Sequence, residues 1–465
     1  MGTNANNTNG INTGHAAAVP GHARPTAYEL IDSRPLTGHQ KSIIGLAIAG
    51  NISEFFDMFL IGFVVSLLTS AWHLTGTAVG VILACSGLGT VAGSILWGRL
   101  ADRYGRKRTF CWCVLCFVAF TVVSAFLPDG AWVPLAVLRV GVGVGVGGLN
   151  VVSIPYVQEF MPAKQRGMLS GLASVFIPMG LLLGSVAQSL IGGNWRILVA
   201  LGALPVFLLV WLAAVPESPR FCQSVGRDDQ ARSALAWALE LPADELGALP
   251  EVREEGTVSY AMLLSNHLKP VVVISLGTFC FVLGSSAIQT WGQTLMKDGF
   301  GFSTRMVAYL FMGVSLVDCL GRFASAWLAD LIGRRRTVFM FGVIAAASCF
   351  YAARFHSNGW QFYAAVLVIM AFADGVFGIL NAFGGEQFPN DVRSTGLGLG
   401  YGIGASAKIV SPILMGALVG GGYVSTNIDL SVISKAFTFF GACLLIGAVI
   451  YLFARETKGK DLESL

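Results

Sequence analysis

Two acids and an arginine lie inside long apolar stretches of the sequence, where a charged side chain is costly. Glu54 and Asp57 are three positions apart, so they share one face of a helix. Arg139, in a later apolar stretch, is a natural partner for these acids. An apolar medium favours the neutral form of an acid, whereas a nearby cation favours the ionised form. A set of this kind can take up and release a proton, and we predict that all three residues take part in proton coupling.

Polar side chains in the second half of the sequence form a candidate substrate site. Gln289 and Gln293 are one helical turn apart and offer both donors and acceptors. Lys408 needs a counter-charge or a wet cavity, and the cavity of a carboxylate transporter offers both. The alternatives are helix packing for the glutamines and a fixed pair with Asp374 for Lys408, and Asp318 is expected in a structural ion pair. The predicted substrate-binding residues are Gln289, Trp291, Gln293, Asp374, Asn381 and Lys408.

Long apolar helices must position these residues. The chain has 465 residues, of which 54% are hydrophobic and 12% charged, against roughly 25% charged in a typical soluble domain. Apolar runs approach the ~20 residues that cross a bilayer. In a bilayer, a single segment can satisfy all of its backbone hydrogen bonds internally only as a helix. We therefore predict an all-α membrane protein with twelve spans, at 43–70, 78–97, 109–127, 132–158, 167–191, 197–215, 271–295, 307–328, 337–353, 360–385, 395–420 and 432–453.

The same composition excludes other classes of protein. The arginines form short clusters between apolar runs, which argues against nucleic-acid binding. The sequence contains no Gly-x-x-x-x-Gly-Lys-Ser/Thr loop, which argues against an ATP-driven pump. The cysteines have no neighbouring histidines or second pair that would complete a metal site. We expect no enzymatic activity, no catalytic residue, no metal and no cofactor.

Basic residues predict how the chain crosses the membrane. The loops at 99–108 and 334–336 are rich in Arg and Lys, whereas the opposite loops carry only scattered basic residues. The positive-inside rule places the richer loops and both termini in the cytoplasm. The expected parts are a disordered cytoplasmic tail at 1–42, a six-helix half at 43–215, a cytoplasmic linker at 216–270, a second six-helix half at 271–453 and a short cytoplasmic tail at 454–465.

Two motifs occur once in each half of the chain. Asp102 and Arg106 recur as Asp330 and Arg334, offset by 228 residues, and the Glu-x-x-Pro motif that begins at Glu159 recurs 227 residues later. Two unrelated motifs with nearly one offset indicate that the halves are related and run in parallel. Paired halves of this kind are typical of transporters that work by rocking about a central site.

These motifs resemble the major facilitator superfamily, from residue 43 to the C-terminus. Asp102-Arg103-Tyr104-Gly105-Arg106-Lys107 is similar to the loop motif of the whole superfamily. Four further motifs resemble those of the sugar-porter-like branch. They are Arg139 with Gly141, Gly143 and Gly145; Pro155-Tyr156 with Glu159; Pro216-Glu217-Ser218-Pro219-Arg220; and Glu456-Thr457-Lys458-Gly459. The stretch 50–57 is similar to the first helix of metabolite:proton symporters that carry organic acids. The second loop motif departs from the first at Ala326, and the seventh span lacks the adjacent glutamines of sugar porters, which weakens a sugar assignment.

The resemblance implies roles for the charged residues. Proton-coupled relatives pair a first-helix acid with a fourth-helix arginine, so we predict Asp57 as the proton carrier, Arg139 as its switchable partner and Glu54 as a further coupling acid. A permanent pair that only joins two helices is the alternative. The resemblance also implies a cytoplasmic gate, made of Asp102, Arg103, Arg106, Glu159, Arg166, Asp330, Arg334, Glu386 and Arg393. Solvated loop charges that only set topology are the alternative for that group.

The favoured function is proton-coupled uptake of a small organic metabolite, best described as an organic or aromatic carboxylate. The alternatives are a sugar or polyol:proton symporter, a drug or metabolite exporter and a non-transporting nutrient sensor. The expected partners are a small-molecule substrate, protons and the lipid bilayer, with no nucleic acid. We expect a monomer in a bacterial inner membrane.

Overall fold

The computed structural model describes residues 26–162, 175–247, 249, 260–355, 357–389, 392–424 and 428–458. Across these ranges the regular structure is helical, apart from one isolated β-bridge between Thr75 and Tyr423. Eleven of the described helical segments are long and apolar enough to cross a membrane. The shorter helix α7 (Pro178–Ile191) is the described part of the fifth expected span. The prediction of an all-α membrane protein is therefore confirmed.

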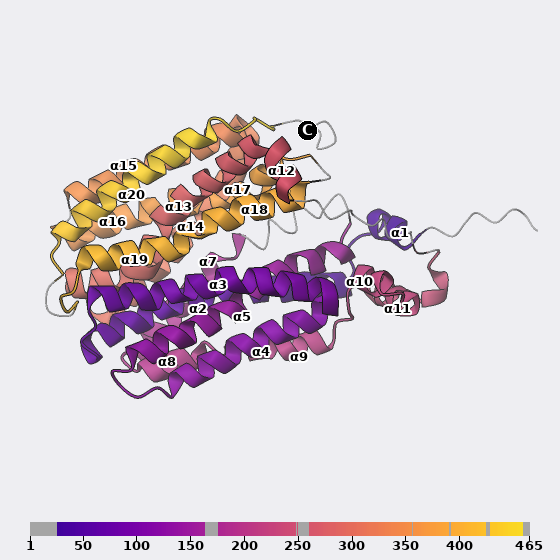
Figure 1. Ribbon diagram of the computed structural model, residues 1–465, viewed down its shortest axis with the longest axis horizontal. Coiled ribbons are helices and arrows are strands. Elements are labelled where there is room, and N and C mark those ends of the chain that lie inside the picture. The colour runs from indigo at the N-terminus through magenta and orange to yellow at the C-terminus, as the bar shows by residue number, and fades with distance from the viewer. Residues whose placement is uncertain are drawn as a thin grey trace, which may run out of the picture.

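The spanning helices form two groups, which lie one above the other in Figure 1. The first group, coloured indigo to pink in Figure 1, comprises α2 (Gly38–Ala71), α3 (Gly76–Tyr104), α4 (Arg106–Ala125), α5 (Trp132–Phe160), α7 and the segment made of α8 (Trp195–Leu201), η2 (Leu204–Val206) and α9 (Phe207–Ala213). The second group comprises α13 (Leu268–Thr294) with η4 (Leu295–Gly299), α14 (Thr304–Ile332), α15 (Arg334–Arg354), α16 (Gly359–Ile369) with η5 (Met370–Asp374) and α17 (Phe377–Gly385), α18 (Arg393–Ala405) with α19 (Ala407–Val419), and α20 (Ser431–Tyr451).

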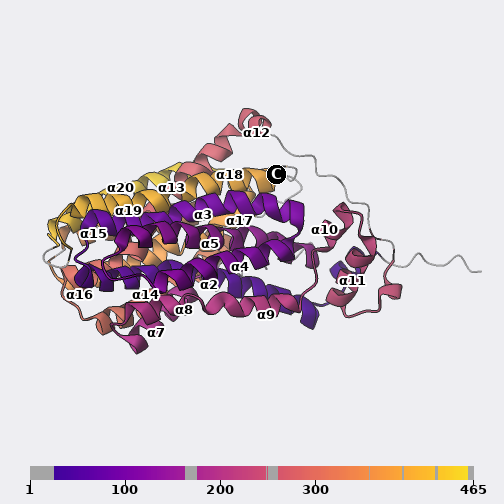
Figure 2. The same cartoon turned by 60° about the horizontal axis from the view of Figure 1, so that its bottom comes forward.

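The described chain also has short helices outside these two groups, and Figures 1 and 2 show α10 and α11 at the right-hand end of the bundle. The short helices are α1 (Ala27–Ser33), α10 (Pro219–Ser224), α11 (Asp228–Leu239), η3 (Ala243–Glu245) and α12 (Tyr260–Asn266). Part of the segment expected to be a disordered tail is thus helical. Thr26 and Glu29 form a capping box at the start of α1, and Leu30 and Ile31 bury against Leu235 of α11. This burial is a long-range contact that local composition does not reveal. Residues 1–25 lie outside the described ranges.

Two glycines end corresponding helices in the two groups. Gly105 follows α3 and Gly333 follows α14, and both have φ of +102°. A side chain there would strain the backbone and would also meet Glu217 in the first group or Glu456 in the second. The tight turns explain why both copies of the loop motif keep this glycine.

The two groups of helices are joined at the end of the bundle that holds residues 72–75. The backbone N–H of Val424 donates to Leu74 O at 3.0 Å, and Thr69 Oγ1 donates to Asp298 Oδ2 at 2.7 Å. Lys297 Nζ donates to Ser70 Oγ at 2.9 Å. Because α3 runs from this end to Gly105, the arginine-rich turns lie at the opposite end.

Candidate functional site

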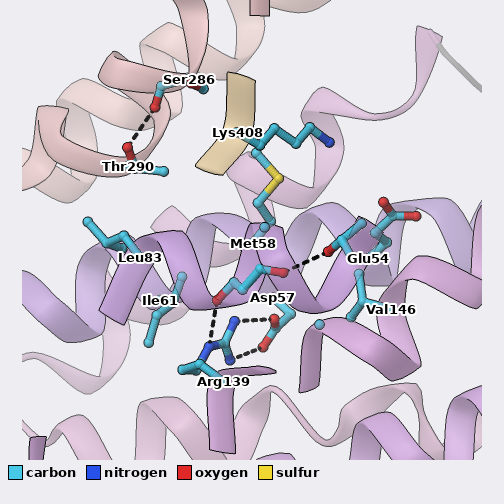
Figure 3. A pocket seen from close by; sticks show the side chains of 14 residues that line it. Glu54, Asp57, Met58, Ile61, Leu83, Arg139, Val146, Ser286, Thr290 and Lys408 are labelled. Atoms are coloured by element: carbon cyan, nitrogen blue, oxygen red, sulfur yellow. Dashed lines mark hydrogen bonds and ion pairs between the residues drawn. The ribbon is translucent and has the colours of Figure 1, made fainter. Parts of the chain in front are cut away.

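A small cavity lies between the two groups of helices, and residues from both line it. Its volume is about 30 Å³, enough for one or two water molecules but far below the roughly 300 Å³ of a small-molecule site. The charged lining residues are Glu54 and Asp57 from α2, Arg139 from α5 and Lys408 from α19 (Figure 3). Three of the sequence-predicted coupling residues and one predicted substrate residue therefore meet in one place.

Asp57 and Arg139 form a bidentate ion pair on one wall of the cavity. Arg139 Nη1 donates to Asp57 Oδ1 at 3.0 Å, and Nη2 donates to Oδ2 at 2.6 Å. Nε of the same guanidinium donates to Ser86 Oγ of α3 at 3.0 Å. Both charged side chains are buried. The fork geometry fixes three helices relative to one another through charge-assisted hydrogen bonds.

Glu54 and Lys408 face the cavity from opposite groups of helices. Glu54 is buried one helical turn before Asp57, and Lys408 lies within electrostatic reach of it. The ammonium group of Lys408 also lies 5.3 Å from the centre of the Phe55 ring. In Figure 3 both side chains point to the side of the cavity away from Ile61. An acid, Glu54, and a lysine, Lys408, thus lie on opposite sides of the boundary between the two halves.

A second charged cluster is buried within the second group of helices, outside the cavity lining. Arg322 Nε donates to Asp318 Oδ1 at 3.2 Å, and Arg322 Nη2 donates to Asp374 Oδ2. Gln289 Nε2 donates to Asp374 Oδ1 at 2.8 Å. Asp374 therefore pairs with Arg322 rather than with Lys408. The π-helical turn η5 carries Asp374, and Gly321 lets it approach α14 closely.

The other predicted substrate residues point elsewhere. Trp291 is fully buried and its Nε1 donates to Pro412 O at 3.3 Å, so it joins α13 to α19. Gln293 Nε2 donates to Gln289 O at 3.3 Å, and its side chain faces Gly62 of α2. Asn381 is exposed on α17. None of these three side chains lines the cavity, because their positions on the helices turn them toward neighbouring helices or outward.

Hydroxyl groups line the cavity at positions that sequence reasoning missed. They are Ser86 and Thr90 of α3, and Ser286 and Thr290 of α13. Each pair is four residues apart, so each marks one polar face of an apolar helix. That spacing is the pattern that could have revealed them. Sequence reasoning also missed Arg322 as the centre of the second cluster. Its position inside an apolar span is the signal that could have revealed it.

The predicted gate residues form two matching clusters. In the first, Arg106 contacts Asp102 at 2.5 Å and Glu159 at 3.4 Å, and Ser218 Oγ donates to Glu159. Glu217 accepts from the backbone N–H of Lys107 at 2.8 Å. Each of these contacts joins helices or loops of the first half.

The second cluster repeats this arrangement in the other half. Arg334 contacts Asp330 at 2.9 Å and Glu386 at 3.6 Å, and Thr457 Oγ1 donates to Glu386. Glu456 accepts from the backbone N–H of Arg334 at 2.9 Å. Of the remaining predicted gate residues, Arg103 lies over the Tyr104 ring, Arg393 begins α18, and Arg166 lies outside the described residues.

Relatives of known sequence share most of this chain. The family described as "Sugar (and other) transporter" matches residues 43–465. The niacin transporter NiaP of Acinetobacter baylyi is 27% identical over 449 residues, which cover 94% of this chain and 98% of that protein. The inner membrane metabolite transport protein YgcS of Escherichia coli is 28% identical over 443 residues, which cover 93% of this chain and 95% of that one.

Solved structures show the same fold. A crystal structure of a D-xylose-proton symporter superposes with a TM-score of 0.72 at 20% identity, and the match covers 91% of this chain and 100% of that one. A second match, with a TM-score of 0.70, is a proton:xylose symporter of the major facilitator superfamily. The chain is therefore a multi-pass membrane transporter, not an enzyme; it belongs to the sugar (and other) transporter family and has the fold of the major facilitator superfamily.

Proposed function

We propose that this transporter is a proton-coupled symporter that imports a small organic carboxylate by alternating access. The observation that carries the proposal is the meeting of Glu54 and Lys408 in one cavity, each from a different half of the molecule. A cation there can recognise a carboxylate, and an acid there can exchange a proton. Aromatic carboxylates are favoured, and niacin, which the NiaP relative is named for, is the first candidate.

Lys408 supplies the chemistry for binding an acid. The ammonium group of Lys408 can bind a carboxylate through charge-assisted hydrogen bonds. The Phe55 ring lies 5.3 Å from that ammonium, outside the cavity lining, and a cation–π contact with it helps to position Lys408. The hydroxyls of Ser286 and Thr290 add donors and acceptors on the wall that α13 forms. A neutral sugar would leave Lys408 without a partner from the substrate.

Binding of protons and binding of substrate are coupled through the same residues. A substrate carboxylate competes with ionised Glu54 for Lys408, so protonation of Glu54 releases Lys408 for the substrate. Asp57 takes up a proton when Arg139 moves away from it. Each bound species then favours the other, because both stabilise the same occupied state. This exchange of partners makes the transport proton-coupled.

The halves must move for a substrate to enter, because the cavity of about 30 Å³ is too small for an aromatic acid. The contacts of Thr69 with Asp298 and of Lys297 with Ser70 hold the halves together at one end. The positive-inside rule makes that end periplasmic, so an imported substrate enters from the periplasm only after these contacts part, and it leaves toward the cytoplasm. The clusters around Arg106 and Arg334 then act as cytoplasmic gate elements. We infer a monomer in a bacterial inner membrane.

Uptake by purified protein in liposomes tests this function. With an inward proton gradient imposed, labelled niacin should accumulate above its external concentration, and a protonophore should abolish the accumulation. Labelled xylose and nicotinamide serve as neutral comparisons for a sugar and for the same ring without its carboxylate. Equal uptake of nicotinamide and niacin, or accumulation that is independent of the proton gradient, would overturn the proposal.

A further inference from the structure

We propose that Asp318 and Asp374 form a second proton-binding site, in which the two carboxyl groups share one proton beside Arg322. The site lies in the second half of the molecule, away from Glu54 and Asp57. It extends the proton coupling proposed above and rests on that function for its role in transport. Its existence can be tested by a measurement that does not depend on transport.

The charges of this cluster do not balance when both acids are ionised. The side chains of Asp318, Arg322 and Asp374 are 1%, 4% and 5% exposed. A guanidinium group stays protonated in proteins, so Arg322 contributes one positive charge against two carboxylates. The surplus negative charge would be buried among apolar helices, which is strongly unfavourable. One bound proton removes the surplus.

The hydrogen bonds of the cluster lack one donor. Arg322 satisfies Asp318 Oδ1, while Asp374 accepts from both Arg322 and Gln289. Asp318 Oδ2 is buried, and within the described part of the chain no donor reaches it. The Asp318 and Asp374 carboxyl groups bind the same guanidinium group, so they lie beside each other. Two ionised carboxylates can only accept, so a proton on one of them supplies the missing donor and makes an O–H···O bond.

Among the described residues, the surroundings of the cluster offer no other charged group that could compensate the surplus charge. Several described helices pack against α14. Of these, α7 and α17 carry no charged residue, and the only titratable residue of α16 is Tyr363, whose hydroxyl donates to Leu310 O. The charges of α13, η4 and α15 lie at helix ends. Cys319 is the remaining titratable neighbour on α14, and its thiol contacts Val175 O. Charge count and donor count therefore lead independently to one proton.

Helix α13 links this site to the cavity. Gln289 binds Asp374, and the neighbouring Ser286 and Thr290 line the cavity on another side of the same helix. A rotation or shift of α13 during transport changes the contact of Gln289 with Asp374. The proton, drawn from water when the helices part, is then held or released according to the state of the cavity.

Infrared difference spectroscopy of the purified full-length protein tests the site, because the C=O stretch of a protonated carboxyl differs from that of a carboxylate. The spectra are recorded as a pH titration in sodium-free buffer. The variants are D318N and D374N, both in an E54Q/D57N background that removes the acids of the cavity. The matched control is D330N, which makes the same chemical change on the same helix at a side chain that is 75% exposed.

The background protein and D330N should show a protonated carboxyl band at neutral pH, and D318N and D374N should each lose it. An absent band at neutral pH, or a band that survives in both variants, would overturn the proposal. So would a band that disappears on adding sodium, since that would assign the site to a metal cation. If D318N fails to fold, D374N and the background spectrum decide alone. Uptake by D57N tests the proposed function separately, so either idea can fail without the other.

Discussion

The two buried charge clusters use corresponding helices of the two halves but differ in charge and in position. The first joins the first, second and fourth spans through Asp57, Ser86 and Arg139. The second joins the seventh, eighth and tenth spans through Gln289, Arg322 and Asp374. The first balances one acid with one base and lines the cavity, whereas the second has an additional acid, Asp318, and lies behind the cavity wall.

The loop clusters around Arg106 and Arg334 differ far less. Each has an aspartate four residues before the arginine, a glutamate across from it, a hydroxyl donor and a glycine with φ of +102°. A tight turn tolerates few sequences, so both copies keep it. An intramembrane cluster needs only satisfied charges, which many arrangements provide. The comparison teaches that the halves stay alike where backbone geometry is demanding and diverge in their buried charge clusters.

The largest functional effect is expected from D57N, which removes the charge that Arg139 binds. Accumulation of niacin driven by a pH gradient should be abolished while exchange between labelled and unlabelled substrate survives, because the carrier can still rock but cannot exchange a proton at this position. Uptake and counterflow assays in liposomes measure both. D129N, in an exposed loop pair with Arg196, is the control and should retain accumulation. Gradient-driven accumulation in D57N would remove Asp57 from the proton path.

Removing either central arginine should cost the most stability. R139A leaves Asp57 buried without its partner, and R322A leaves Asp318 and Asp374 without theirs. Loss of one member of a buried pair costs about 3–5 kcal/mol, so each variant should unfold at a markedly lower temperature. R139K and R322K retain the charge without the fork and should lose less. Thermal unfolding in detergent compares the four variants, and unchanged stability in R139A would show that the first cluster is not a structural pair.

Lys408→Ala should separate acids from neutral substrates. A hydrogen bond to a charged group contributes roughly 1.5–3 kcal/mol, so the affinity for niacin should fall about ten- to a hundredfold. The affinity for nicotinamide should change much less. Lys435, an exposed lysine near the start of α20, provides the control K435A. Equal losses for both ligands in binding measurements would indicate that Lys408 serves only packing.

Glycine-to-alanine changes test the equivalence of the loop clusters. G105A and G333A place a side chain at a positive φ with extended ψ, a conformation that is nearly restricted to glycine and costs about 1–3 kcal/mol in each half. G98A is the control, because its Cβ would meet only Val151 Cγ1 at 3.4 Å and because the second copy already has Ala326. Unequal losses in G105A and G333A, measured by thermal unfolding, would show that the clusters are not equivalent.

The smallest effects are expected from the exposed aspartates of the loop clusters. Asp102 and Asp330 have side chains that are 71% and 75% exposed, so their pairs with arginine are screened by water. D102N and D330N should each change the free energy of unfolding by no more than about 0.5 kcal/mol. A larger loss in either variant would mean that the exposed pair holds the turn together.

Local sequence patterns were enough to predict the fold class and part of the site. Apolar run length predicted the spans, and a common offset predicted two related halves. Glu54, Asp57, Arg139 and Lys408 stood out because charge inside an apolar span is costly, and the structure brings all four to one cavity. The predicted substrate residues Gln289 and Asp374 are instead bound to each other beside Arg322. Hydropathy ranks residues by cost and does not say which way a helix face points.

The sequence by itself thus determined which segments are helical, that they lie in a membrane, and which charged residues need partners. These properties depend on residue type and on the helical repeat, which act over one or two turns. Only the tertiary structure decided the partners: Arg139 with Asp57, Arg322 with both Asp318 and Asp374, and Lys408 opposite Glu54. Helix rotation and the π-helical turn at Asp374 set those contacts, and both depend on packing between segments far apart in the chain.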